Sequence, residues 1–226
     1  MSLPALRRVA FVHASRAAVD PVTHYYAAEA PEFECTNLLD DGVMRALAAG
    51  DAERTQRRLR EMIATARDEY AAEVAMLTCS ALSPNAMREL RESAGIPLLK
   101  IDEPMARKSV SLGSRIGVLS TFPATAGTTR ELIEEAARAA GRTVEIVGVL
   151  EERALQALLA GSEEEHDRLF LEAAAKLAGQ PGLDAIVLAQ VSMARLASKA
   201  AVGVAVPVLN SLDTSLAAVR SLLAGQ

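Results

Sequence analysis

The chain has no tryptophan, only two cysteines and only three histidines among its 226 residues. Two cysteines in a chain of this length cannot form a disulfide framework, which predicts a reducing compartment, the cytoplasm. The three histidines show no spacing with Cys or Asp that is typical of a metal site, so we expect no metal. These absences argue against a disulfide scaffold and against a dedicated metal centre.

Long apolar runs and blocks of like charge are also missing. No stretch approaches the ~20 apolar residues that span a bilayer, and the start, MSLPALRRVAFVHAS, is too short and too polar for a signal peptide. With 24 Lys+Arg against 29 Asp+Glu, the net charge of −5 argues against nucleic acid and anionic membrane as partners. The stretches SLGSRIG and ATAGT match neither G-x-G-x-x-G nor a Walker loop, so no nucleotide cofactor is predicted.

Apolar residues fill 50% of the positions, enough for a proper core, and they come in short runs that alternate with longer helical stretches. The runs are almost continuously apolar, which is typical of strands buried on both faces of a parallel sheet. Strand and helix alternating along the whole chain is the α/β pattern. The expected strands are 7–15, 32–39, 72–80, 96–101, 115–121, 143–150, 183–190 and 206–210.

Three segments of the first half recur in the second half in the same order. RRVAFVHAS and SRIGVLSTF start at 7 and 114, EVAMLTCSA and DAIVLAQVS at 73 and 184, and IPLLKID and VPVLNSLD at 96 and 206. The nearly constant offset predicts two similar parallel-sheet α/β lobes with the functional site between them. The lobes would be 1–113 plus 211–226, and 114–210, with the last helix packed back on the first lobe. The alternative is one undivided sheet.

Ligands of open parallel sheets bind beyond the carboxyl ends of the strands, so the residues that follow each strand are the first candidates. They are small hydroxyls, one thiol and one amide, without a carboxylate. Hydroxyls and backbone N–H groups at helix starts suit a carboxylate or an enediolate-like oxyanion. The set is His13, Ala14, Ser15, Arg16, Thr78, Cys79, Ser80 and Ala81 from the first half, and Ser120, Thr121, Phe122, Thr125, Gln190, Val191 and Ser192 from the second.

Cys79 is the candidate whose side chain supports the widest range of catalytic roles. It ends a strand just before an expected helix start at Ser83-Pro84. A helix N-terminus lowers the pKa of a thiol and makes it a usable acid, base or nucleophile. The alternative is a small buried apolar residue, which is how a free Cys usually behaves. Cys35, inside EFECTNLL with no helix start after it, is predicted to be a core thiol.

The histidines and Arg16 have weaker support. His13 could carry a second proton, although a strand-end His is often hydrogen-bonded scaffolding. Arg16 could pair with a substrate carboxylate or lie on the surface. His24 and His166 fall on polar helical ground and are expected to be solvated.

Two of these stretches resemble a known family. LTCSALSP, at 77–84, resembles the first catalytic-Cys motif of the aspartate/glutamate racemase superfamily, and RIGVLSTFPAT, at 115–125, resembles its segment that contacts the substrate carboxylate. The superfamily includes glutamate, aspartate and hydantoin racemases, maleate cis–trans isomerases and arylmalonate decarboxylases. The resemblance covers essentially the whole chain. It implies a pseudo-duplicated fold and cofactor-independent chemistry on a small carboxylic acid.

The mirrored position departs from this family. Its two-base racemases have a Cys in each lobe, whereas here the second position is Gln190, in LAQVSM. An amide cannot exchange a proton at neutral pH, and Ser192 has no adjacent base to activate it. The sequence therefore predicts a single-cysteine member that keeps Cys79 and lacks the second-lobe Cys.

One thiol permits several reactions, and the residues leave them open. Racemisation or epimerisation would use Cys79, with His13 in place of the lost Cys. Decarboxylation would protonate an enediolate on one face, although the decarboxylases of the family carry their Cys in the second lobe. Isomerisation would use Cys79 as a nucleophile, and loss of catalysis would leave a carboxylate-binding protein. A hydrolase is disfavoured because the thiol has no G-x-S-x-G elbow and no His–Asp relay.

The leading hypothesis is a cofactor-independent racemase or epimerase with a small carboxylic acid as its partner. Phe122 and Met193 would either add an apolar lining near the site or pack between the lobes. Relatives are commonly dimers or larger, which leaves a homo-oligomer open. The predicted site residues are Cys79 and His13 for proton transfer, and Ser15, Thr78, Ser80, Thr121, Phe122, Thr125, Gln190 and Ser192 for substrate binding.

Overall fold

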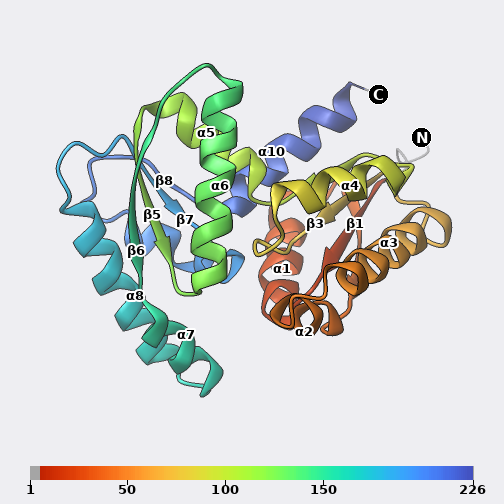
Figure 1. Ribbon diagram of the computed structural model, residues 1–226, viewed down its shortest axis with the longest axis horizontal. Coiled ribbons are helices and arrows are strands. Elements are labelled where there is room, and N and C mark those ends of the chain that lie inside the picture. The colour runs from red at the N-terminus through yellow and green to blue at the C-terminus, as the bar shows by residue number, and fades with distance from the viewer. Residues whose placement is uncertain (1–5, 226) are drawn as a thin grey trace. The chain divides into compact units, whose positions relative to one another are not determined.

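The computed structural model describes residues 6–225, which form two compact units. The described part of the first unit is 6–101 with 216–225, and the second unit is 102–215. Each unit has its own sheet, and Figure 1 labels many of the helices and strands, which are numbered in chain order. The lobe boundaries expected from the sequence, after residues 113 and 210, stay a prediction.

The first sheet has four parallel strands in the order β2-β1-β3-β4. The two central strands, β1 and β3, are buried, whereas the edge strand β2 is only partly covered. Burial at every position of β3 agrees with its continuous apolar run. The bounds are β1 (Arg7–His13), β2 (Phe33–Leu39), β3 (Val74–Leu77) and β4 (Leu98–Lys100).

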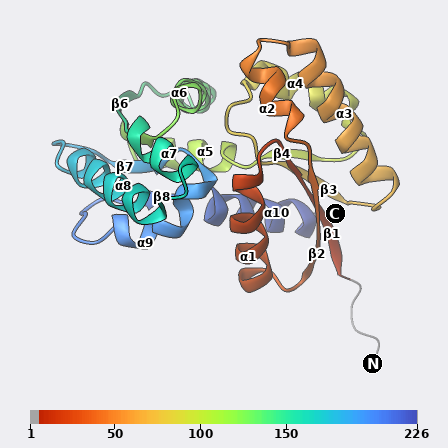
Figure 2. The same ribbon diagram turned by 90° about the horizontal axis from the view of Figure 1, so that it is seen from below.

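Helices cover both faces of the first sheet. On one face, α3 and α4 pack against Val12 and Leu77. On the other face, Tyr26 of α1 packs edge-on against Phe11, and its hydroxyl lies near the sulfur of Met76. Figure 2 shows α3 and α4 on one side of β1 and β3, and α1 on the other. The bounds are η1 (Arg16–Ala18), α1 (Val19–Glu29), α2 (Gly42–Ala48), α3 (Ala52–Asp68) and α4 (Pro84–Ala94).

The last helix, α10 (Ser211–Ala224), contributes its C-terminal part to the first unit. Arg220 donates hydrogen bonds to the carboxylate of Glu32 and to the carbonyl of Glu29. Arg7, at the start of β1, donates to the carbonyl of Leu223. These bonds attach the end of the chain to its beginning.

The second sheet also has four parallel strands, in the order β6-β5-β7-β8. Helices α5 and α6 pack on the face that contains Val118 and Val187, and α8, η2 and α9 pack on the face that contains Leu119 and Leu188. The strands are β5 (Arg115–Ser120), β6 (Glu145–Leu150), β7 (Ala185–Leu188) and β8 (Val208–Leu209). The helices are α5 (Glu103–Leu112), α6 (Pro123–Ala139), α7 (Glu152–Leu159), α8 (Glu163–Ala178), η2 (Val191–Leu196) and α9 (Ala197–Ala200).

The two sheets repeat one topology. In each, the second strand lies at the edge, the first and third lie side by side in the centre, and the fourth closes the other edge. Val12 pairs with Leu77 in the first sheet, and Leu119 pairs with Leu188 in the second, so the central strands share their register as well. The predicted pair of similar α/β lobes is confirmed, and the alternative of one undivided sheet is wrong.

Gly113, which joins α5 to β5, has no room for a side chain. A Cβ built on it would lie 2.1 Å from the Cγ of Asp184, whose carboxylate accepts hydrogen bonds from the N–H groups of Ser114 and Arg115. We expect Gly113→Ala to displace Asp184 and to lower the free energy of unfolding by about 2 kcal/mol. Urea denaturation measures the loss. The matched control is Gly127→Ala, where a Cβ meets nothing within 4 Å; equal stability of the two variants would refute the expected clash.

Candidate functional site

Cys79 lies two residues beyond the end of β3 and is only 6% exposed. It continues the alternation of the β3 side chains and packs with Leu77 on the face that α3 and α4 cover. The expected helix start after it is confirmed, because Ser83 caps α4 by accepting a hydrogen bond from the N–H of Ala86. The thiol therefore lies in the turn that leads from a buried strand into a capped helix.

His13 and Thr78 form a hydrogen-bonded pair at the same end of the first sheet. His13 is fully buried, with its Nδ1 2.9 Å from the Thr78 hydroxyl and its Nε2 2.9 Å from Oδ1 of Asn37. With the Asn37 oxygen as acceptor, Nε2 carries the proton and Nδ1 accepts from Thr78. Phe11, two residues earlier on β1, contacts α1, so His13 belongs to the opposite face of the sheet from Cys79. Both imidazole nitrogens are thus engaged within the unit.

Burial lowers the pKa of His13 from its usual value of 6.5, because the imidazolium would lose its hydration, and the hydrogen bond with Asn37 opposes this in part. As the pH falls through 6.5, the unfolded chain takes up this proton before the folded chain does, so His13 makes the folded state less stable. We expect His13→Gln, which can keep both hydrogen bonds without titrating, to lose stability less steeply over this range than the wild type. Urea denaturation at a series of pH values measures both slopes, and equal slopes would contradict a neutral, buried His13.

The other candidates of the first half lie around this end of the sheet. Ser15 caps η1, because its Oγ accepts a hydrogen bond from the N–H of Ala17. Ser80, next to Cys79, is 9% exposed. Arg16 is exposed, as is His24, which agrees with the expectation that His24 is solvated. The first half-site, defined as His13, Thr78, Cys79 and Ser80, therefore combines one thiol with hydroxyls and an imidazole.

Gln190 has the same place in the second unit as Cys79 has in the first, since it lies two residues beyond the end of β7. Its Oε1 accepts hydrogen bonds from the N–H of Thr121 at 2.8 Å and from the Thr121 hydroxyl at 3.0 Å, with Ser120 Oγ at 3.4 Å. The amide oxygen thereby ties the end of β7 to the end of β5. Within residues 6–225, the Nε2 of Gln190 has no hydrogen-bond partner, so its two N–H groups are available to an anion.

The remaining candidates of the second half lie at the starts of its helices. Phe122 is half-buried and directly precedes α6, and Thr125 is buried in the first turn of that helix. Ser192 is half-buried in η2. Its neighbour Met193 is fully buried in the core that α8 covers, so Met193 packs within its own unit. The second half-site is defined as Ser120, Thr121 and Gln190.

Sequence reasoning missed a carboxylate at this end of the first sheet. Asp40 directly follows β2, and its N–H donates to the carbonyl of His13. The guanidinium of Arg58 forms a two-point ion pair with Asp40, with the Nη2 of Arg58 2.6 Å from Oδ1, and holds the pKa of Asp40 below its usual range. The expectation of a strand-end set without carboxylates is therefore wrong, although this carboxylate is already neutralised.

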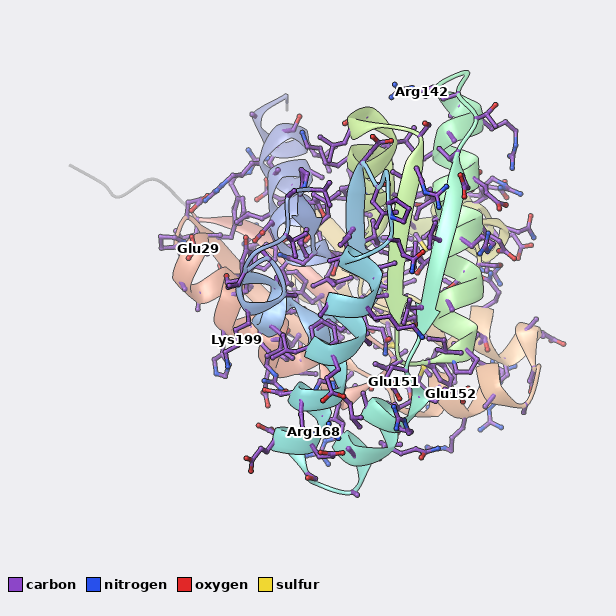
Figure 3. The ribbon with its side chains drawn as sticks, turned by 90° about the vertical axis from the view of Figure 1, so that its left-hand side faces the viewer. Glu29, Arg142, Glu151, Glu152, Arg168 and Lys199 are labelled. Carbon is purple, nitrogen blue, oxygen red and sulfur yellow. The ribbon has the colours of Figure 1, made fainter. Side chains whose placement is uncertain are left out.

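The second sheet has the matching acid. Glu151 directly follows β6, its N–H donates to the carbonyl of Ser120, and Arg153 donates to both of its carboxylate oxygens at 2.8 Å. Figure 3 labels Glu151 and Glu152 together at this end of β6. The ion pair lowers the pKa of Glu151. Asp40 and Glu151 thus hold equivalent positions in the repeat, a signal that the common offset of the two halves could have given.

Two further expectations are wrong. Cys35 is half-buried on the edge strand β2, not in the core, and burial together with the charge of Glu32 raises the pKa of its thiol to about 11. His166 is buried, not solvated, because it shares the inner face of α8 with Phe170, on which its ring stacks. Its Nδ1 lies 2.9 Å from Oδ1 of Asp167. The three glutamates in the first turn of α8 suggested an exposed segment, although the side chain of His166 lies on the buried face of this helix.

Residues 6–225 contain no group of three or more His, Cys, Asp or Glu residues that could hold a metal ion. No helix in this described part of the chain is long and apolar enough to cross a membrane. The geometry therefore consists of two polar half-sites at equivalent ends of two parallel sheets, with hydroxyl, amide, imidazole and thiol groups.

A duplicated pair of four-stranded parallel sheets, with paired polar groups at the carboxyl ends of the central strands, defines an α/β protein of the two-lobed racemase type. Residues 83–220, more than half of the chain, match the sequence model of the Asp/Glu/Hydantoin racemase family. The chain belongs to this family. A comparison with curated proteins gave no match.

Solved structures share the whole fold at low sequence identity. Allantoin racemase from Klebsiella pneumoniae is 19% identical with a TM-score of 0.74, over 96% of this chain and 88% of that one. Glutamate racemase from Bacillus anthracis is 14% identical with a TM-score of 0.72, over 97% and 82%. Glutamate racemase from Francisella tularensis, in complex with D-glutamate, is 13% identical with a TM-score of 0.71, over 97% and 82%. The predicted racemase-like fold is confirmed.

Proposed function

We propose that this chain is a cofactor-independent racemase or epimerase that exchanges the proton on the carbon next to the carboxylate of a small acid. The observation that carries the proposal is a thiol and an amide, Cys79 and Gln190, at equivalent places beyond two equivalent strands. Family membership supports a reaction of the racemase type. In this proposal, Cys79 moves the proton and Gln190 binds the anion.

The proton-transfer step assigns the Cys79 thiolate as the base. Its sulfur takes the α-proton, and the electron pair of the broken C–H bond moves into the carboxylate to give an enediolate. The substrate carboxylate and this enediolate need hydrogen-bond donors, and one preorganised donor contributes ~3 kcal/mol in other enzymes. Among the donors of the second unit, we assign this role to the Nε2 of Gln190, because the hydrogen bond from Thr121 to Oε1 already fixes the amide group. Thr125 and Ser192 are assigned supporting roles in binding.

The second proton of a full racemisation needs another group, and His13 is the candidate that the sequence offered. Its two ring nitrogens are hydrogen-bonded to Thr78 and Asn37, so one of these hydrogen bonds would have to break before His13 could contact a substrate. The lowered pKa of His13 keeps its imidazole neutral at neutral pH, so His13 would remove the α-proton in the direction in which Cys79 starts as the thiol and returns a proton on the opposite face. Its catalytic role stays a prediction, and Ser15, Ser80 and Phe122 likewise stay proposed substrate contacts.

Deuterium exchange at Cα tests the function. The purified protein is incubated in D₂O with a panel of α-amino acids, hydroxy acids, substituted malonates, maleate and hydantoins, including allantoin, and NMR follows the carbon-bound protons. Exchange without net reaction supports racemisation or epimerisation. Release of carbon dioxide, or conversion of maleate, would replace the proposal by a decarboxylase or by an isomerase that uses Cys79 as a nucleophile.

A non-catalytic carboxylate-binding protein is the second candidate. It is favoured by one observation, the 6% exposure of a Cys79 that packs among apolar residues, which is the environment of an inert thiol. Calorimetric binding of a carboxylate without any exchange of its α-proton supports this alternative. Such a result would exclude the racemase for that ligand.

A further inference from the structure

A second ionisable side chain lies on the face of the first sheet that carries Cys79. Lys100 ends β4 and is fully buried, whereas Lys108, Lys176 and Lys199 are all exposed. Burial of an ammonium group is unfavourable unless nearby groups compensate its charge. A lysine that stays inside in spite of this requires a physical reason, and nothing in the proposed function so far uses it.

The register of the strands places this lysine beside the thiol. Lys100 pairs with Leu77, the residue two before Cys79, and neighbours paired in a parallel sheet point to the same face. Leu77, Leu98 and Cys79 belong to one cluster of buried residues beneath α3 and α4. The stem of Lys100 therefore runs along this face, and its Nζ lies 3.5 Å from the carbonyl oxygen of Ser80, the residue after Cys79.

The other ionisable groups around this end of the sheet are placed differently. His13 lies on the opposite face and is bonded to Thr78 and Asn37. Asp40, after β2, is neutralised by Arg58 of α3. The faces of α3 and α4 that meet the sheet consist of neutral residues.

Two charged residues complete this inventory along β4. Arg91 of α4 donates to the carbonyl of Leu98, two residues before Lys100 on β4. Asp102, two residues after Lys100 in the chain, is also buried and is the first residue of the second unit. The positive charge nearest in the strand register to Cys79 is that of Lys100.

We propose that Lys100 is a positioning residue that holds Cys79 in its thiolate form. A fixed ammonium against the carbonyl oxygen of Ser80, the residue after Cys79, stabilises the negative sulfur, because the charges interact in a poorly hydrated environment. During proton abstraction the S–H bond forms as the C–H bond breaks, the electron pair stays on the substrate, and Lys100 remains protonated. This inference rests on the proposed function in that it makes Cys79 the reactive group.

The titration of the Cys79 thiol, followed by the far-ultraviolet absorbance of the thiolate, tests this inference. All variants carry Cys35→Ser, so that Cys79 is the only thiol, and the same chain with Cys79→Ser supplies the blank. We expect the apparent pKa of Cys79 to lie well below the ~8.5 of a free cysteine. We expect Lys100→Met, which keeps the apolar stem, to raise it by about one unit or more, which is a tenfold loss of thiolate at pH values below both pKa values.

Arg60→Met is the matched control, because it removes an equal charge from an exposed position of α3 in the same unit. It should leave the titration of Cys79 unchanged. A purely structural Lys100 would change the stability of the Met variant but not the thiol titration, and that outcome overturns the proposal. If Lys100→Met does not fold, the titration of the Cys35→Ser chain is the test. An ordinary or raised pKa of Cys79 in that chain overturns the proposal without any change at Lys100.

This experiment uses no substrate, so its failure is distinct from failure of the proposed function. A low, Lys100-dependent pKa with no Cα exchange on any acid would leave the activated thiol in place and remove the racemase. Exchange of the Cα proton that depends on Cys79 but not on Lys100 would support the racemase and would overturn the role of Lys100. A low pKa of Cys79 that changes with neither Lys100→Met nor Arg60→Met would overturn the role of Lys100 and would mean that the turn before α4 stabilises the thiolate.

Discussion

Cys79→Ser is expected to lower the rate of Cα proton exchange on the true substrate by about 10³-fold or more, while the chain stays folded. A hydroxyl has the shape of a thiol, but without an adjacent base it is not ionised at neutral pH. Serine also fits the space of the 6%-exposed side chain, so the core beneath α3 and α4 should keep its packing. NMR of the substrate in D₂O measures the exchange, and circular dichroism confirms the fold.

The matched control for this variant is Cys35→Ser. Cys35 lies on the edge strand β2, and its thiol, with a pKa of about 11, is protonated at neutral pH. It should therefore contribute nothing to proton transfer, and its removal should leave the rate unchanged. Full activity in Cys79→Ser would exclude the thiol mechanism. Loss of activity in Cys35→Ser alone would mean that Cys35, and not Cys79, is the reactive thiol, which contradicts the proposal.

Gln190→Glu is expected to weaken substrate binding by about 100-fold with little change in stability. One carboxylate oxygen of the glutamate can accept the hydrogen bonds of Thr121, so the connection between β7 and β5 remains. The other oxygen replaces the two N–H donors of Nε2 by a negative charge, which repels the carboxylate of the substrate. The dissociation constant, from calorimetry with an exchange-active acid, measures the effect.

Gln190→Leu separates the two roles of this amide. It removes both the acceptor and the donors, so it should weaken binding and also lower the free energy of unfolding by about 2 kcal/mol, because the N–H of Thr121 is left unpaired. The glutamate variant should show the first effect without the second. Unchanged affinity in Gln190→Glu would mean that Gln190 is a brace between strands and does not touch the substrate.

The fold could be predicted from the sequence because its signal is distributed over many residues. Burial on both faces produces continuous apolar runs such as Val74–Leu77, and a repeated topology produces a repeated offset. The ends of the strands were less predictable. The strand expected at 72–80 stops at Leu77, because the chain turns toward α4, and Thr78, Cys79 and Ser80 in this turn are buried like the strand itself.

The candidate site was predictable where one residue carries the signal. The offset of 111 between Cys79 and Gln190 gave their equivalent positions, which the strand registers bear out. The hydrogen bonds of Gln190 Oε1 and the buried charge of Lys100 were not predictable, because they depend on where side chains meet across neighbouring strands. A lone lysine in the apolar run IPLLKID was the signal that could have drawn attention to Lys100.

The hydrogen bonds of Gln190 also limit which side chains this position tolerates. Since its oxygen accepts from the backbone and the hydroxyl of Thr121, Gln190→Cys would leave a buried N–H group without an acceptor, at a loss of about 1–3 kcal/mol. A second thiol at this place would therefore require a compensating change around β5 that supplies a new acceptor.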